Sequence, residues 1–321
     1  MGSERKKMRF EIFFSRFFTN LPKILLTDLL FAIPSLLFIF GFYFLNRMLF
    51  NGGISVLFSL IVIIPIFPFY SGVVQVVRNI ARGDSDVKVI PCFFNALKSN
   101  FLLFLLHGVV ECAIAVMSYL AISFYINMLS QHPIMYVLLF FCIIIVMLLL
   151  YASWYICLLS VTYDLPIRYL YKNSFLMSFG ELKNNMIGIF AFIVAFAVFF
   201  TFVIFAQSPL LLIIVLSALW ALLVPATLTF CYVFFIYDGM VDILQSKQDL
   251  EAEKAIEKGA QPQPNPVAET ITDFSDVDIS KLRDTDDFIY FNGKMMKQST
   301  VLRLAKEQQN KQTSSEEDND E

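Results

Sequence analysis

The chain has 321 residues, of which 58% are apolar and only 16% are charged, and it contains 36 phenylalanines. Soluble domains carry about 25% charged residues, so this composition excludes an ordinary soluble protein and predicts an all-α, polytopic membrane protein. The net charge of −3 is unevenly divided, because residues 1–237 carry a net +6 and residues 238–321 a net −9. A basic membrane part and an acidic tail are therefore expected.

Residues 1–23 are expected to form a basic, amphipathic helix. Five phenylalanines recur there at the spacing of one helical face, namely Phe10, Phe13, Phe14, Phe17 and Phe18. An aromatic face with basic flanks suits a helix that lies in the lipid headgroup region. Packing of these rings on the protein's own helices explains the pattern equally well.

Six apolar segments predict a membrane domain over residues 24–237. Each segment has about the 20 residues needed to cross the hydrocarbon core of a bilayer. Pro34, Pro65, Pro68 and Pro225 lie inside them and predict kinks rather than breaks. The expected spans are 24–45, 54–77, 101–125, 134–162, 187–206 and 210–237.

The distribution of Lys and Arg predicts the orientation of the spans. Basic residues gather before the first span and in the links between spans two and three and between spans four and five. On the opposite side Arg47 is the only basic residue. Both termini are therefore expected in the cytoplasm, which requires an even number of spans.

A short pattern recurs before the odd-numbered spans. F-N-A-L-K-S-N-F at residues 94–101 returns as F-G-E-L-K-N-N-M at 179–186 and, more loosely, as F-S-R-F-F-T-N-L at 14–21. We interpret the membrane part as three parallel repeats, each an interfacial helix followed by a helical hairpin. Candidate cytoplasmic contact residues, for lipid headgroups or acidic partners, are Arg78, Arg82, Phe94, Lys98, Asn100, Lys183 and Asn185.

Residues 238–321 are expected to form a partly disordered cytoplasmic tail. A charged helix should leave the membrane over 238–259 and end before the linker Q-P-Q-P-N-P at 261–266. Asn292-Gly293 between apolar residues predicts a β-hairpin over 288–296, and a short helix is expected near 300–309. The tail either docks a partner or only keeps this end of the chain soluble.

Three residues form a candidate intramembrane polar site. His107 and Glu111 stand four residues apart on the third span and so share a face, and Glu111 falls near the bilayer midplane. Such a pair can relay a proton or hold a cation, or it can simply fix helix packing through hydrogen bonds. Asp28, near the inner end of the first span, is expected to form a salt bridge or a hydrogen bond to a neighbouring helix.

No catalytic, cofactor-binding or metal-binding motif is found, so we do not expect an enzyme. The five cysteines include no C-x-x-C pair, and two ligands on one helix do not make a metal site. The acidic tail would repel a phosphate backbone, which argues against nucleic acid as a partner. Partners are expected in the lipid bilayer and among other membrane proteins.

Two segments carry a family resemblance. They read I-P-I-F-P-F-Y-S-G-V-V-Q-V-V-R-N-I-A-R-G-D at 64–84, followed by the repeat at 94–101, and R-Y-L-Y-K-N-S-F-L-M-S-F at 168–179. The chain resembles the YesL-like family of bacterial integral membrane proteins, a family of unknown function, over roughly residues 10–240. The resemblance implies a multi-pass protein of the cytoplasmic membrane of a Gram-positive bacterium, associated with carbohydrate uptake and utilisation. It supplies no catalytic residue, and His107 and Glu111 are not part of its pattern.

The leading hypothesis is a non-catalytic accessory protein that supports other membrane components, such as a sugar-uptake complex. The alternative is a small transporter or channel with His107 and Glu111 on its path. The two differ in whether Glu111 faces an open cavity or a tightly packed seam between helices.

Overall fold

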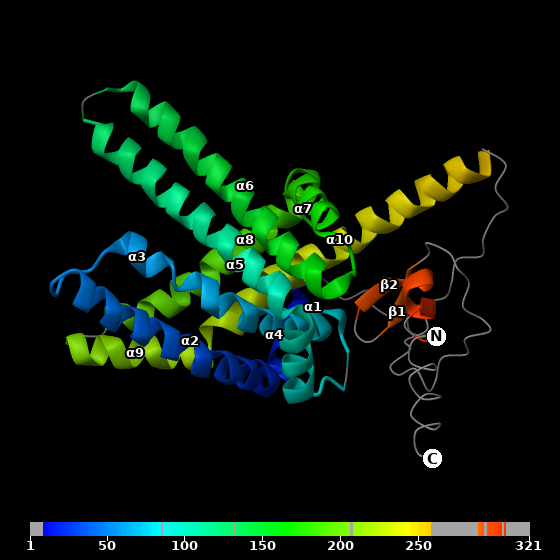
Figure 1. Cartoon of the computed structure of the whole chain (residues 1–321), viewed down its shortest axis with the longest axis horizontal. Coiled ribbons are helices and arrows are strands. Elements are labelled where there is room, and N and C mark those ends of the chain that lie inside the picture. The colour runs from blue at the N-terminus through cyan, green and yellow to red at the C-terminus, as the bar shows by residue number, and fades with distance from the viewer. Residues whose placement is uncertain are drawn as a thin grey trace, which may run out of the picture. The chain divides into compact units, whose positions relative to one another are not determined.

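The computed structural model describes residues 9–84, 86–130, 132–205, 208–257, 288–291, 294–303 and 305. Most of these residues are helical (Figure 1). They are α1 (Arg9–Thr19), α2 (Leu21–Leu49), α3 (Val56–Leu60), α4 (Ile63–Arg82), α5 (Val89–Met128), α6 (Ile134–Thr162), α7 (Ile167–Gly180), α8 (Leu182–Ile204), α9 (Pro209–Leu222) and α10 (Val224–Glu257). The strands β1 (Phe288–Phe291) and β2 (Lys294–Lys297) follow.

Six helical segments of the described chain are long and apolar enough to cross a membrane, which confirms the all-α polytopic class. The chain divides into two compact units, one of residues 1–158 and 171–244 and the other of residues 159–170 and 245–321. The first unit holds the greater part of every span. Each unit is considered by itself.

The expected unit of interfacial helix plus hairpin is seen in the first and third copies but not in the second. The helix is interrupted at Asn20, which separates α1 from α2, and at Glu181, which separates α7 from α8. Pro22 accounts for the first break and Gly180 precedes the second, since proline and glycine disfavour a helix interior. The second copy has neither residue at these positions, so α5 runs unbroken for 40 residues and contains both the expected surface helix and the span.

Two of the four span prolines break their helices instead of kinking them. The sixth expected span is divided at Leu223, two residues before Pro225, into α9 and α10. The second is divided at residues 61–62, just before Pro65, into α3 and α4. A proline donates no backbone N–H and its ring clashes with the carbonyl four residues earlier. Pro34 and Pro68, in contrast, lie within the continuous helices α2 and α4.

The packed core of the first unit centres on α4, whose residues 73–77 are nearly all fully buried. This helix packs along α5 and α2, and α9 packs beside α2 and α8. Glycines permit the closest approach of α4 and α5. A Cβ added to Gly108 would lie 2.8 Å from the Phe67 Cβ and 3.0 Å from the Ile64 carbonyl oxygen.

Packing on the protein's own helices, one of the two explanations for the phenylalanines of α1, is observed for part of this helix. Phe13 is buried, and its ring packs 5.2–5.4 Å from Phe230, Phe234 and Phe235 of α10. Three other phenylalanines of the same face, Phe10, Phe14 and Phe18, stay exposed. Part of the aromatic face therefore joins the bundle, and the rest remains available to lipid.

The described part of the tail confirms the expected hairpin, because β1 and β2 pair antiparallel with Phe288 opposite Lys297. Residues 298–303 are helical, which agrees with the start of the expected helix. The Q-P-Q-P-N-P linker, Asn292-Gly293 and the acidic end of the chain lie outside the described residues.

Candidate ligand cavity

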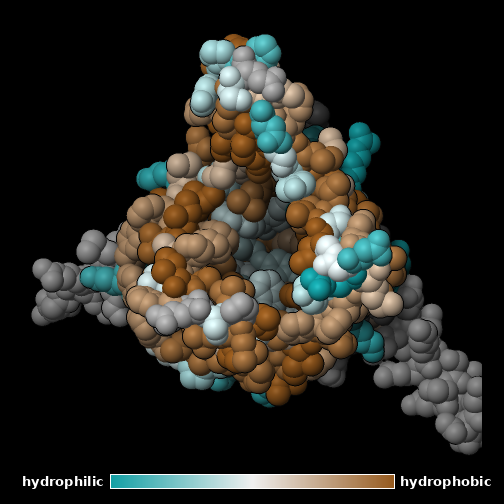
Figure 2. Space-filling view, turned by 90° about the vertical axis from the view of Figure 1, so that its left-hand side faces the viewer, coloured by the Kyte–Doolittle hydropathy of each residue, from teal (hydrophilic) through white to brown (hydrophobic). Residues whose placement is uncertain are grey.

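A cavity of about 590 Å³ lies between the membrane helices of the first unit. All six spans contribute to its lining, with residues from α2, α4, α5, α6, α8, α9 and α10. Figure 2 views the end of the molecule at which α2 turns into α3, α5 into α6 and α8 into α9, and shows a hollow with an apolar rim and a paler floor. This volume is within the range of small-molecule sites in proteins.

The floor and the wall of the cavity differ in chemistry. Chain direction places Ile39, Val62, Ile63, Ser118 and Val146 toward the hairpin turns, and all of these except Ser118 are aliphatic. Most of the polar and aromatic lining residues lie deeper between the helices. They include Tyr70, Glu111, Ser153, Trp154, Thr229 and Tyr232.

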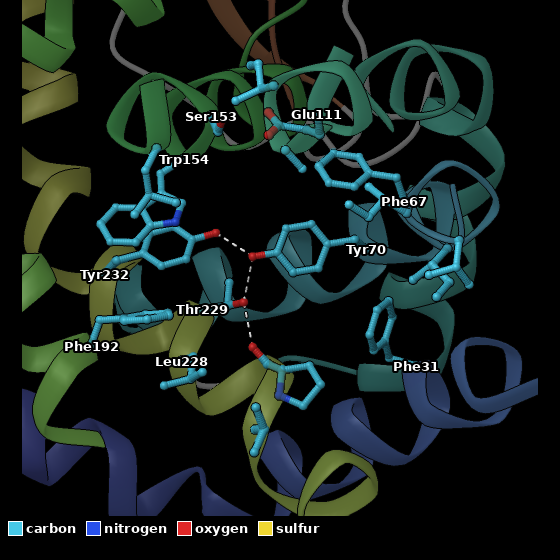
Figure 3. A pocket seen from close by; sticks show the side chains of 18 of the residues that line it. Phe31, Phe67, Tyr70, Glu111, Ser153, Trp154, Phe192, Leu228, Thr229 and Tyr232 are labelled. Carbon is cyan, nitrogen blue, oxygen red and sulfur yellow. Dashed lines mark hydrogen bonds between the residues drawn. The ribbon is translucent and has the colours of Figure 1, made fainter. Parts of the chain in front are cut away.

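Three hydroxyl groups at the floor form one chain of hydrogen bonds (Figure 3). The Thr229 hydroxyl donates to the Pro225 carbonyl at 2.6 Å, since a carbonyl can only accept. Its oxygen then accepts from the Tyr70 hydroxyl at 2.8 Å, and the Tyr70 oxygen accepts from Tyr232 at 2.6 Å. Every proton in this chain is used, so the hydrogen-bonding capacity left to the three hydroxyls consists of acceptor lone pairs.

Aromatic rings surround these hydroxyls. Trp154 stacks on Tyr232 with centroids 4.4 Å apart and ring planes 1° apart, and Phe192 packs 5.6 Å from Trp154. On the other side, Phe31 and Phe67 lie 6.1 and 5.7 Å from Tyr70. Aromatic pairs at such distances add stability beyond their buried area, so these contacts hold the side chains of the floor in place.

Glu111 faces this cavity from α5. Its carboxylate lies beside the Ser153 hydroxyl of α6, which can donate a hydrogen bond to it (Figure 3). Among the described residues, no Lys, Arg or His lines the cavity or forms an ion pair with Glu111. Its charge is therefore not neutralised by a neighbouring cation.

His107 is directed elsewhere, so the expected pair with Glu111 is divided between two environments. The His107 Nδ1 lies 2.9 Å from the Tyr171 hydroxyl of α7, and the two rings pack edge to face. Burial raises the pKa of Tyr171 to about 12, so its phenol keeps a proton with which it can donate to this nitrogen. His107 is buried and does not line the cavity.

Asp28 joins a neighbouring helix, as one of the two expectations for it stated. Its Oδ1 accepts a hydrogen bond at 2.6 Å from the backbone N–H of Ala226, in the first turn of α10. Pro225, which breaks the sixth span, has thus created a helix start inside the bundle, and Asp28 caps it from α2. Asp28 does not line the cavity.

The candidate cytoplasmic contact residues divide into exposed and buried groups. Phe94, Lys98 and Lys183 are exposed. Arg82 forms an ion pair with Asp84 at 3.6 Å. The remaining three are buried and engage the protein itself: Arg78 donates to Asn79, Asn100 to the Ala96 carbonyl, and Asn185 accepts from Tyr155.

Tyr70, Trp154 and Trp220 line the cavity, and none of them is among the site residues expected from the sequence. Tyr232 and Thr229 are not identified from the sequence at all. A polar or aromatic residue in an apolar helix has the same appearance whether it faces lipid, a neighbouring helix or a cavity. Within the described chain, no cluster of His, Cys, Asp or Glu could hold a metal ion.

Fold and cavity together define a polytopic, all-helical membrane protein with a ligand-sized space between its spans. A family described as "Protein of unknown function, DUF624" matches residues 31–122, from α2 to α5. The matched segment contains Glu111, His107 and the α4 side of the cavity. Comparison with curated proteins and with solved structures finds no match.

Proposed function

We propose that the protein is a non-catalytic membrane protein that binds a small ligand in the cavity between its six spans, as a transporter or a membrane receptor does. The observation that supports this proposal is the position of Glu111. A carboxylate inside a bilayer is energetically costly, and such a residue is therefore a candidate for a functional site. Glu111 lies on an open cavity rather than in a packed seam between helices.

The distribution of Lys and Arg supports an orientation in which the mouth of the cavity lies on the outer face of the membrane. The hairpin turns at the mouth are poor in basic residues, and both termini would lie in the cytoplasm. In this orientation a ligand enters from outside, or from the outer leaflet, and meets aliphatic walls before it reaches the polar floor.

The DUF624 match and the resemblance to YesL-like proteins suggest the biological setting. We propose the cytoplasmic membrane of a Gram-positive bacterium, with a role near carbohydrate uptake and utilisation. Aromatic rings such as Trp154 and Tyr232 would also suit the apolar faces of a glycoside.

The test uses intrinsic fluorescence, because both tryptophans of the chain, Trp154 and Trp220, line the cavity. The purified protein is titrated with a hydrophobic cation, a hydrophobic anion, a neutral aromatic compound and phenyl β-glucoside. We expect at least one of them to change the emission saturably. Transport is then measured as flux of that compound into proteoliposomes, and unchanged flux with Glu111→Gln would argue against transport through this site.

A matched pair of substitutions on α5 tests whether the ligand occupies the cavity. Ala115 lines the cavity and Ala113, two residues earlier, is exposed. Ala115→Phe should weaken binding about tenfold or more, because overpacking costs about 1–3 kcal/mol, whereas Ala113→Phe should leave it unchanged. If no compound alters the emission, or if Ala115→Phe binds as well as the unaltered protein, the proposed function is wrong.

An accessory role is the second candidate, and it is favoured by the exposed Phe94, Lys98 and Lys183. A partner complex would dock on these residues or on residues 238–321. Affinity capture with the full chain and with a chain ending at residue 237 tests the tail, and identical partners in both would argue against tail docking.

A further inference from the structure

We infer that the cavity selects an organic cation, with an ammonium or similar group at Glu111 and an apolar body between the aromatic rings and the aliphatic walls. This inference rests on the proposed function and specifies the chemical class of its ligand. A preference for organic cations would distinguish this cavity from a site for anions, metal ions or neutral sugars.

The charge of the lining favours a cation. Glu111 is the one acidic residue among the described residues that line the cavity, and none of them is a Lys, Arg or His that could balance it. A buried carboxylate without a counter-charge is strongly unfavourable. A bound cation would supply the missing partner, whereas an anion would be repelled.

The hydroxyl groups of the floor favour the same ligand. Because Thr229 donates to the Pro225 carbonyl, the protons of Tyr70 and Tyr232 are also committed along the chain. The hydrogen-bonding capacity that this chain leaves unused therefore consists of oxygen lone pairs. These accept hydrogen bonds from an ammonium or attract a positive charge, but they offer no donor to an anion.

The aromatic rings complete the site. Trp154, Tyr232, Tyr70, Phe31 and Phe67 present π-systems around the same space. The face of an aromatic ring attracts a cation, most strongly when water is excluded. A calcium or magnesium ion would instead require about six oxygen ligands, usually including several carboxylates or carbonyls, and the described lining offers one carboxylate and a few hydroxyl groups.

Two compounds of similar shape and opposite charge test the inference directly. Tetraphenylphosphonium and tetraphenylborate are compared by tryptophan fluorescence of the full-length protein, with triphenylphosphine oxide as the neutral compound. We expect the cation to bind at least about tenfold more tightly than either of the others, since one nearby opposite charge is worth more than that factor in a partly buried site.

Substitution of Glu111 shows whether the preference arises from this carboxylate. Glu111→Gln should weaken binding of the cation about tenfold and leave the neutral compound unchanged. Glu111→Asp should retain the preference, which also guards against a variant that fails to fold. The matched control is Glu11→Gln, which removes a carboxylate from the exposed surface of α1 and should change neither affinity.

The outcomes separate this inference from the proposed function. If the neutral compound or the borate binds as tightly as the cation, or if Glu111→Gln keeps the full preference, the site does not select cations although it binds ligands. If none of the three binds and phenyl β-glucoside does, the cation inference also fails while the cavity stays a binding site. Absence of binding by any compound overturns both.

Discussion

Two carboxylates lie in the apolar part of the chain, and the structure gives them opposite surroundings. Asp28 is fully buried and its Oδ1 is held by the backbone of α10, while its Oδ2 has no hydrogen-bond partner among the described residues. Glu111 lies on the cavity, with the Ser153 hydroxyl beside it. Asp28 thus contributes to the fold, whereas Glu111 faces an open space.

The capping role of Asp28 predicts a graded response to substitution. Asp28→Ala leaves the buried N–H of Ala226 without an acceptor and should lower the free energy of unfolding by about 1–3 kcal/mol. Asp28→Asn keeps an acceptor oxygen at the same place and should cost less. Thermal unfolding of both variants in detergent, followed by circular dichroism, measures the difference.

Ligand binding provides the control for this prediction. Because Asp28 does not line the cavity, the folded fraction of Asp28→Asn should bind with unchanged affinity. Equal stability of Asp28→Ala and the unaltered protein would show that the contact with α10 is not a stabilising cap.

At the scale of elements, the helices owe their positions to small residues and prolines. Gly108 lets α4 pass close to α5, with only 3.0 Å between an added Cβ and the Ile64 carbonyl oxygen. Pro65 and Pro225 lie in the first turns of α4 and α10, where their spans are broken near the cavity, and residues at both breaks, Val62 and Val224, contribute to its lining. The breaks therefore help to form the space that the ligand would occupy.

The close packing of α4 and α5 predicts opposite effects for two glycine substitutions. Gly108→Ala should destabilise the protein by about 1–3 kcal/mol, because its methyl group would meet backbone atoms of α4 that cannot move away easily. Gly41→Ala is the matched control on α2, where nothing lies within 4 Å. It should be neutral, or stabilising by up to about 1 kcal/mol through helix propensity.

Detergent-solubilised protein and differential scanning fluorimetry suffice for this comparison. Equal melting temperatures of the two variants would mean that α4 and α5 are further apart than the structure places them.

At the scale of the whole molecule, the three hairpins bring their turns to the end at which the cavity opens (Figure 2). The exposed apolar surface of the spans faces the lipid, which accounts for the large number of exposed Phe, Leu and Ile side chains. Ligand binding as proposed would therefore depend on orientation, because the cavity opens toward one end of the bundle.

Cysteine labelling in intact cells tests that orientation. In a cysteine-free background, His132→Cys in the turn between α5 and α6 should react with a membrane-impermeant maleimide, and Lys98→Cys should react only after the cells are opened. Both positions are exposed in the structure, so a difference reports the side of the membrane. The reverse pattern would place the termini outside and the cavity mouth in the cytoplasm.

The sequence by itself determined the class of protein, the number of spans and the limits of the fourth span, Ile134–Thr162. Apolar length and the periodicity of a helix are local properties, so they can be recognised without knowing any neighbour. The β-hairpin of the tail was predictable for the same reason. The merging of an interfacial helix into α5 and the break at Leu223 were not predicted, because the effect of a single Pro or Gly depends on what packs against it.

Only the tertiary structure decided which polar residues share a site. Glu111 and His107 are four residues apart on one helix, yet one faces the cavity and the other faces Tyr171. Tyr70 and Tyr232 are 162 residues apart and share a hydrogen bond. The physical reason is that the spans are apolar on all sides, because lipid and the interior of the bundle both favour apolar side chains. The pattern along the chain therefore does not reveal which side of a helix packs on another helix and which side faces an open space.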